Sequence, residues 1–78
     1  MERAVIFAKL KEILGKLRQE AYLDTVDENT TLVRDLGLDS LTVLLMALAA
    51  EKEFGIRFEG TPQFDTVGQV VEYIEKAL

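Results

Sequence analysis

Apolar residues recur every three or four positions in three separate segments of this 78-residue chain. Such spacing places them on one face of an α-helix, so the pattern predicts three amphipathic helices. The rest of the chain shows no β-hairpin signal and no internal repeat. We therefore expect an all-α fold, a small bundle of three main helices in a single domain over residues 1–78. The first segment carries its stripe at Ile6, Leu10, Ile13 and Leu17.

Start and stop residues mark the second and third predicted helices. The second runs from Ser40 to about Phe54, and Gly55 follows at the usual position of a helix stop. The third begins near Thr66, where either Asp65 or Thr66 can serve as the N-cap. Its apolar stripe consists of Val67, Val70, Val71, Ile74 and Leu78.

Two breaks separate the predicted helices. Residues 24–31 are rich in Asp, Glu, Asn and Thr, which predicts a long loop between helices one and two. Before the last helix, Gly60-Thr61-Pro62 breaks the chain, and Phe64 should anchor a short helix or turn. We expect four apolar residues to pin the second half of the long loop to the core: Leu32, Val33, Leu36 and Leu38. The helical stripes predict a core of Ile6, Leu10, Ile13, Leu17, Val43, Met46, Phe54, Val67, Val71 and Ile74.

Composition excludes several classes of function. The chain has no cysteine and no histidine, so disulfides and thiolate metal sites are excluded and no metal site is expected. A formal net charge of −5 argues against a nucleic-acid partner, which would require a basic surface. No apolar run approaches the roughly 20 residues needed to cross a bilayer, so we expect no membrane insertion. The charged N-terminal stretch is unlike a signal peptide, which favours a cytoplasmic protein.

A serine stands at the start of the second predicted helix, within the run Gly37-Leu38-Asp39-Ser40-Leu41. A serine hydroxyl is a weak nucleophile unless a base activates it, and histidine is the usual base. The chain has no histidine, and no lysine lies within a turn of Ser40 in the sequence. We therefore expect no catalytic residue and no enzyme activity. Instead, Ser40 is predicted to receive a phosphate-linked group, which the N–H groups and positive dipole of a helix N-terminus tolerate.

The run Asp35-Leu36-Gly37-Leu38-Asp39-Ser40-Leu41 resembles the prosthetic-group site of acyl carrier proteins. The resemblance extends across nearly the whole chain, through Met46-Ala47-Leu48 to Phe64-Asp65-Thr66-Val67. It implies that Ser40 receives 4′-phosphopantetheine from coenzyme A through a phosphopantetheinyl transferase. The thiol of this arm would then carry acyl intermediates as thioesters between acyl-transferring or synthase enzymes. The resemblance implies a monomeric carrier in fatty-acid, polyketide or related specialised acyl metabolism.

Helix two departs from the family pattern on its exposed face. Fatty-acid carriers commonly place carboxylates two and five residues after the modified serine, where this chain has Thr42 and Leu45. Within the helix, Glu51 and Glu53 are the acidic residues that remain. Because basic partner surfaces read that acidic face in familiar carriers, the change favours a specialised member of the family. The resemblance assigns partner recognition to Asp39, Leu41, Thr42, Leu45 and Glu51.

The second helix also carries a second apolar stripe, opposite the one that contains Val43 and Met46. A helix that is apolar all round is either buried or covered by another molecule. Two interpretations remain open: loop residues such as Leu36 and Leu38 cover the second stripe, or the stripe faces a partner. The second interpretation also permits another function, a non-catalytic helical module that binds a partner or itself. The stripe consists of Leu41, Leu44, Leu45 and Leu48.

Overall fold

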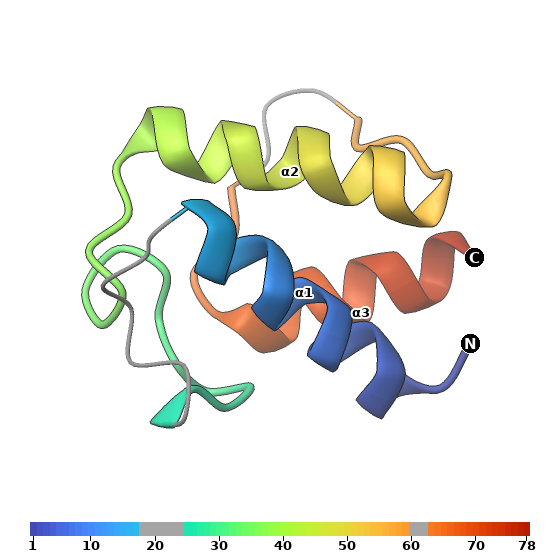
Figure 1. Ribbon diagram of the computed structural model, residues 1–78, viewed down its shortest axis with the longest axis horizontal. Helices are drawn as coiled ribbons and strands as arrows, with labels where there is room; N and C mark the ends of the chain where they lie inside the picture. Colours follow the sequence, from blue (N-terminus) through green and yellow to red (C-terminus); the bar gives the residue numbers. More distant parts are fainter. Residues whose placement is uncertain (18–24, 60–62) are drawn as a thin grey trace.

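The computed structural model describes residues 1–17, 25–59 and 63–78 and contains three α-helices, α1 (Arg3–Leu17), α2 (Ser40–Phe54) and α3 (Val67–Ala77). The first helix, α1, packs against both others, and the two chain ends lie near each other at one end of the bundle (Figure 1). In the described part of the chain there is one isolated antiparallel bridge, between Thr31 and Thr66, and no strand. The expected all-α bundle is therefore confirmed.

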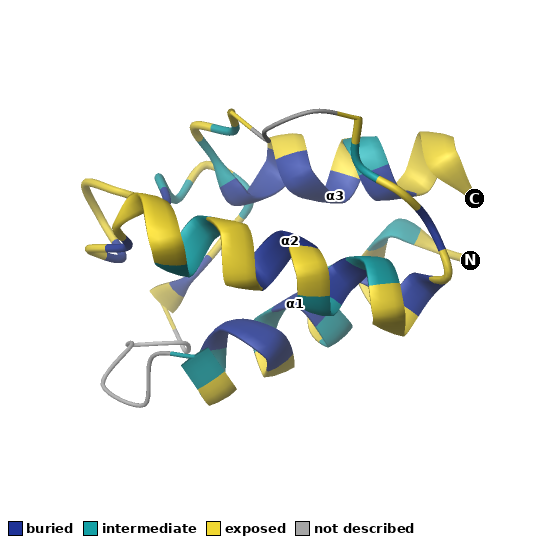
Figure 2. Cartoon of the chain, turned by 90° about the horizontal axis from the view of Figure 1, so that it is seen from above, coloured by how far each residue is buried: buried dark blue, intermediate teal, exposed yellow. Residues whose placement is uncertain are grey.

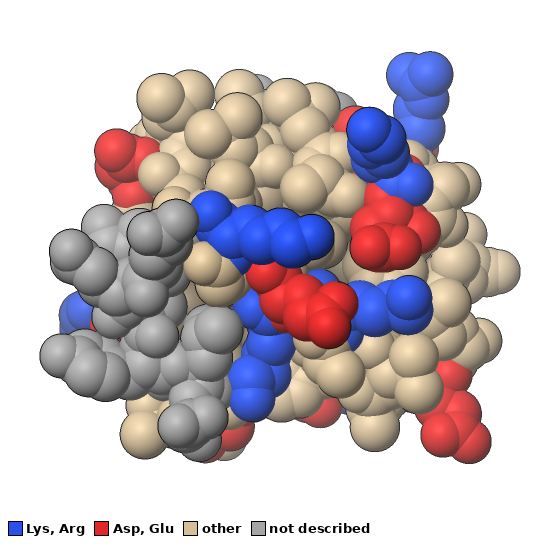
Figure 3. Space-filling model, in the orientation of Figure 1, with Lys and Arg blue, Asp and Glu red and all other residues tan. Residues whose placement is uncertain are grey.

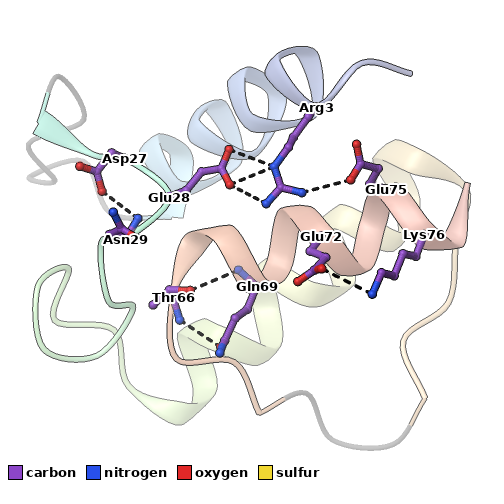
Figure 4. Close-up of polar contacts among 9 residues, drawn as sticks. All are labelled: Arg3, Asp27, Glu28, Asn29, Thr66, Gln69, Glu72, Glu75 and Lys76. Atoms are coloured by element: carbon purple, nitrogen blue, oxygen red, sulfur yellow. Dashed lines mark hydrogen bonds and ion pairs between the residues drawn. The ribbon is translucent and has the colours of Figure 1, made fainter.

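The ends of α2 and α3 lie where the capping residues predict them. Gly55 follows α2 with φ of +66°, and its N–H donates to the carbonyl of Glu51, which ends the helix. Thr66 is the N-cap of α3: its hydroxyl accepts the N–H of Gln69, and the Gln69 side chain accepts the N–H of Thr66 (Figure 4). This reciprocal pair is a capping box, so Thr66 rather than Asp65 starts α3.

One apolar face of each helix and several loop residues form a single core. Figure 2 shows the buried residues of the three helices turned toward one another. Eight of the ten residues predicted for the core are buried; Leu17 and Val43 are half-buried, because they lie in the last turn of α1 and the first turn of α2. Leu78 follows the last residue of α3 and is 52% exposed, so its place in the buried stripe was wrong. Leu14 is fully buried although the narrow stripe omitted it, because α1 faces two helices.

Three leucines pin the second half of the long loop, as predicted: Leu32, Leu36 and Leu38 are buried. Val33 is 63% exposed, so its predicted role was wrong. The chain turns here, and the N–H of Leu36 donates to the carbonyl of Thr31 over 3.2 Å. This turn places Leu32 and Leu36, which are four residues apart, on the side of the core and directs the side chain of Val33 outward.

The first half of the loop is held against the start of α3. The N–H groups of Val67 and Gly68 donate to the carbonyls of Thr30 and Glu28 over 2.9 and 2.8 Å. The first N–H groups of a helix have no partner within the helix, so these loop carbonyls satisfy them. A third bond, from the N–H of Leu32 to the carbonyl of Asp65, extends the same contact.

An ion-pair cluster ties this loop to the first and third helices. Arg3 Nε donates to Glu28 Oε1 over 3.0 Å, and Arg3 Nη1 donates to Glu75 Oε1 over 3.1 Å (Figure 4). The hydrogen bond from Arg3 lowers the pKa of Glu28. All three side chains are partly exposed to solvent, so the cluster fixes the geometry more than it adds stability.

A second polar pair shapes the loop just before α2. The N–H of Thr31 donates to Asp35 Oδ2 over 2.8 Å, and the N–H of Asp35 donates to Thr31 Oγ1 over 2.9 Å. Hydrogen bonds from the backbone and side chain of Thr31 lower the pKa of Asp35. The carboxylate of Asp35 therefore holds the turn between the buried Leu32 and Leu36 in its ionised form.

Between α2 and α3, residues 55–59 and 63–66 turn at Gly55 and bend at Asp65 without forming a helix. The predicted break at residues 60–62 lies outside the described residues. Phe64 anchors the segment as expected: it packs against the core and lies edge-on to Phe58 and Tyr73, at ring-centroid distances of 5.7 and 5.9 Å. The Tyr73 hydroxyl donates to the carbonyl of Arg57, so the cluster holds the segment on α3.

We expect Gly68→Ala to destabilise the protein, although alanine normally favours a helix over glycine by about 0.5–1 kcal/mol. A Cβ atom at position 68 would lie 2.7 Å from the backbone oxygen of Glu28, so the loop would have to move. Overpacking of this kind costs about 1–3 kcal/mol. Urea unfolding followed by circular dichroism measures the change. A gain in the free energy of unfolding would contradict the close contact between loop and helix.

We expect Asp35→Asn to make folding less sensitive to acid. The pKa of Asp35 is lower in the folded protein than its unfolded value of about 3.9, so the unfolded chain takes up the proton first. The contribution of the carboxylate is therefore present above that unfolded value and is lost as the pH falls through the folded pKa. Urea unfolding between pH 6 and pH 2 should show a shallower loss of stability in the variant. Parallel curves for the variant and the wild type would disprove this role.

Candidate functional site

Gly37 turns the chain from the loop into α2. Its φ is +67°, in the left-handed region that glycine adopts without steric cost. On either side Leu36 and Leu38 enter the core, and the N–H of Leu38 donates to the carbonyl of Leu32 over 3.0 Å. The chain thus leaves the core at Asp39, and the next residue begins α2 at the surface.

Asp39 is the N-cap of α2. Its backbone is extended, with φ of −91° and ψ of 177°, and its Oδ1 accepts the N–H of Thr42 over 2.8 Å. Its carbonyl accepts the N–H of Val43 over 3.0 Å and so begins the helical ladder. Asp39 and Ser40 are both residue types that favour the N-cap position of a helix. The structure assigns it to Asp39, which leaves the Ser40 hydroxyl outside the capping interaction.

Ser40 is the first residue of α2, and its side chain is exposed. In the described part of the chain, no protein group accepts the backbone N–H of Ser40 or of Leu41. The positive end of the helix dipole lies at the same place. A phosphodiester on the Ser40 oxygen would find two N–H donors and a favourable field there, so the residues present fit a phosphate-linked group.

The surroundings of Ser40 offer no catalytic apparatus. The whole chain lacks histidine and cysteine, so the usual bases and the thiolate nucleophile are missing. Among the described residues, no three His, Cys, Asp or Glu side chains gather closely enough to hold a metal ion. The geometry suits a serine that is modified by another protein.

The second apolar stripe of α2 lies on the surface, and we call Leu41, Leu44, Leu45 and Leu48 the leucine face. Their exposed fractions are 64%, 43%, 42% and 52%. Figure 2 shows the exposed residues along the outward side of α2. The interpretation that Leu36 and Leu38 cover the stripe was wrong, because both side chains are buried in the core, where they anchor the loop.

Four of the five residues predicted for partner recognition gather at the start of α2: Asp39, Leu41, Thr42 and Leu45. Glu51 lies about 16 Å further along the helix from Ser40 at 1.5 Å per residue. Its Oε2 accepts the N–H of Phe58 over 2.7 Å, so the fold itself uses this carboxylate. Sequence analysis missed this bond because Phe58 returns to the helix only after the turn at Gly55. Figure 3 shows the resulting surface, in which charged side chains gather over α1 while much of the area over α2 is uncharged.

None of the three described helices is long and apolar enough to span a membrane.

Comparison with known proteins identifies the family. The model of the phosphopantetheine attachment site matches residues 8–74. The acyl carrier protein of Clostridium perfringens (strain 13 / Type A) is 44% identical over 71 residues, which cover 88% of this chain and 92% of the relative. The acyl carrier protein of Coprothermobacter proteolyticus is 41% identical over 80 residues, covering 100% of this chain and 96% of the relative. That of Thermotoga maritima is 38% identical over 79 residues, covering 97% and 95%.

These matches confirm the resemblance and the expectation of a carrier that is not an enzyme. They also establish the cofactor: proteins of this kind hold 4′-phosphopantetheine covalently, and its thiol supplies the thioester chemistry that a chain without cysteine lacks. The exposed start of α2 has room and hydrogen-bond donors for such a group. The chain belongs to the acyl carrier protein family, whose members carry acyl groups on a phosphopantetheine arm.

Proposed function

We propose that 4′-phosphopantetheine is attached to Ser40 and that the protein carries acyl intermediates as thioesters on this arm. One observation carries the proposal: Ser40 is the only serine of the chain, and it is exposed at the first position of α2. The phosphodiester oxygens would accept the N–H groups of Ser40 and Leu41. Asp39, whose Oδ1 caps α2 beside Ser40, would lie in the surface that contacts the phosphopantetheinyl transferase.

We further propose that residues 1–78 act as one carrier domain, monomeric and cytoplasmic, without nucleic-acid or membrane partners. The single core shared by the three helices supports the single domain. The net charge of −5 disfavours nucleic acid. The partners would be the transferase and the synthases or acyltransferases that act on the thioester.

The leucine face supports a specialised pathway rather than general fatty-acid synthesis. Leaving a leucine side chain exposed to water is less favourable than burying it by about 25 cal/mol per Å² of apolar area. Thr42 and Leu45 stand where the family commonly has carboxylates, and neither carries a charge. We infer a partner that receives the leucine face in an apolar groove, with Leu41 and Leu45 as anchors beside the modified serine. Thr42 and Glu51 would border this contact.

We expect incubation with coenzyme A and a broad-specificity transferase to add one phosphopantetheinyl group to the wild type. Ser40→Ala should abolish the increase in intact mass, because no other serine is present. Thr42→Ala is the matched control: it removes the other hydroxyl in the first turn of α2 and should keep the modification. An unmodified wild type, or a mass increase that survives in Ser40→Ala, would refute the attachment site. The first of these outcomes, an unmodified wild type, would favour the plain interaction module.

We expect the double substitution Thr42→Asp and Leu45→Glu to speed acyl transfer to a general ketoacyl synthase. New carboxylates would complement a basic partner surface, raising association roughly tenfold at low salt and less at high salt. The double variant Thr42→Asn/Leu45→Gln is the control, because it replaces the same two side chains with polar groups of equal size that carry no charge. Equal rates for the wild type and the charged variant would show that this face does not decide the partner.

A further inference from the structure

An open groove lies between the second half of α1 and the second half of α2. Its volume is about 480 Å³, within the range of about 300–1,000 Å³ that small-molecule sites usually have. Its apolar lining comes from Ile13, Leu17 and Ala49. The residues lining it belong to two helices that pack on each other, so it is a feature of the folded bundle.

Charged side chains border the groove, and most of them are basic. Lys16 and Lys52 line it, and in the described part of the chain neither forms an ion pair. Glu53 also lines the groove, but its Oε2 lies 3.9 Å from Lys9 Nζ, so a third lysine offsets its charge. Glu12 precedes Lys16 by one helical turn and is not among the lining residues. The groove therefore combines an apolar floor with two lysines available to an anion.

The groove is continuous with the proposed attachment site. Leu41, Leu45 and Ala49 follow one another at four-residue spacing, so they form one ridge of α2. The ridge begins beside Ser40, and its third residue lines the groove about 13 Å along the helix axis at 1.5 Å per residue. Both leucines are exposed. A flexible chain attached at Ser40 would thus meet apolar surface all the way to the two lysines.

Whether an acyl chain binds in this groove or in the bundle core depends on whether the chain ends in a carboxylate. Taking a carboxylate into an apolar interior is very costly unless it is paired, whereas a methyl end gains by burial. An open groove lets the methylene groups contact Leu17 and Ala49 while the carboxylate stays in water beside the ammonium groups. Because the acyl chain is tethered to the protein, its effective concentration at the groove is high, and two exposed lysines are enough to bind its carboxylate.

We propose that the groove between α1 and α2 binds acyl chains that end in a carboxylate, carried on the protein's own arm. Lys16 and Lys52 pair with the carboxylate, and the groove floor contacts the chain. This inference rests on the attachment at Ser40 proposed above. It names the class of cargo: half-thioesters of dicarboxylic acids.

The test compares two cargoes of equal length on the ¹⁵N-labelled protein, one ending in a carboxylate and one in a methyl group, both transferred from their coenzyme A thioesters. Intact mass first reports loading. Amide spectra should then show shifts at Leu17 and Ala49 for the carboxylate-ended chain only. In Lys16→Gln/Lys52→Gln the ratio of bound to free chain should fall roughly three- to tenfold, as expected for two exposed ion pairs. The control Lys11→Gln/Lys76→Gln has the same change in charge away from the groove and should keep the shifts.

Three outcomes overturn the proposal while leaving the carrier function intact: equal shifts for the two cargoes, an equal loss in the control double variant, or shifts at the core residues Met46 and Val70 instead of the groove. A wild type that takes up neither cargo contradicts the attachment at Ser40, and the groove proposal falls with it. The mass measurement separates these two failures.

Discussion

The burial of three loop leucines is the constraint on which the presentation of Ser40 depends. Leu32, Leu36 and Leu38 enter the core from a segment without regular structure, and burying a leucine is worth about 1.5–3 kcal/mol. Because Leu38 is only two residues from Ser40, its burial leaves the serine little freedom of position. The left-handed backbone at Gly37 allows two leucines so close together to point into the core.

Helix α2 has to satisfy two opposing demands, and this explains its composition. Its inner side must fill a small core, and Met46, Ala47, Ala50 and Phe54 do so. Its outer side must remain accessible beside Ser40, the proposed attachment site. An ordinary surface would be polar there, and the exposed leucines instead resemble the buried centre of a protein interface. Covering these leucines with a partner would be favourable, because it would remove apolar area from water. Their exposure lowers the solubility of the protein, and the net charge of −5 offsets this effect.

Sequence reasoning predicted what depends on local pattern and missed what depends on distant segments. The bounds of α2 follow from neighbouring residues and agreed with the structure, and the cap of α3 is Thr66, one of the two residues predicted for it. The exposure of Val33 and Leu78 did not follow from the pattern, because a turn and a chain end interrupted the apolar spacing. The bond from Phe58 to Glu51 and the groove between α1 and α2 arise from segments brought together only by folding. No local signal could have indicated them.

The leucine face and the ridge of α2 that leads to the groove have Leu41 and Leu45 in common. Leu45 belongs to the leucine face and also to the ridge that leads from Ser40 to Ala49. A partner that covers Leu41 and Leu45 would occupy the same apolar surface as a chain lying along that ridge. If both proposals hold, partner and cargo would compete for this surface of α2, and docking would release the chain from the ridge when an enzyme needs it. Such an exchange would take place on the surface of α2 and would require no rearrangement of the core.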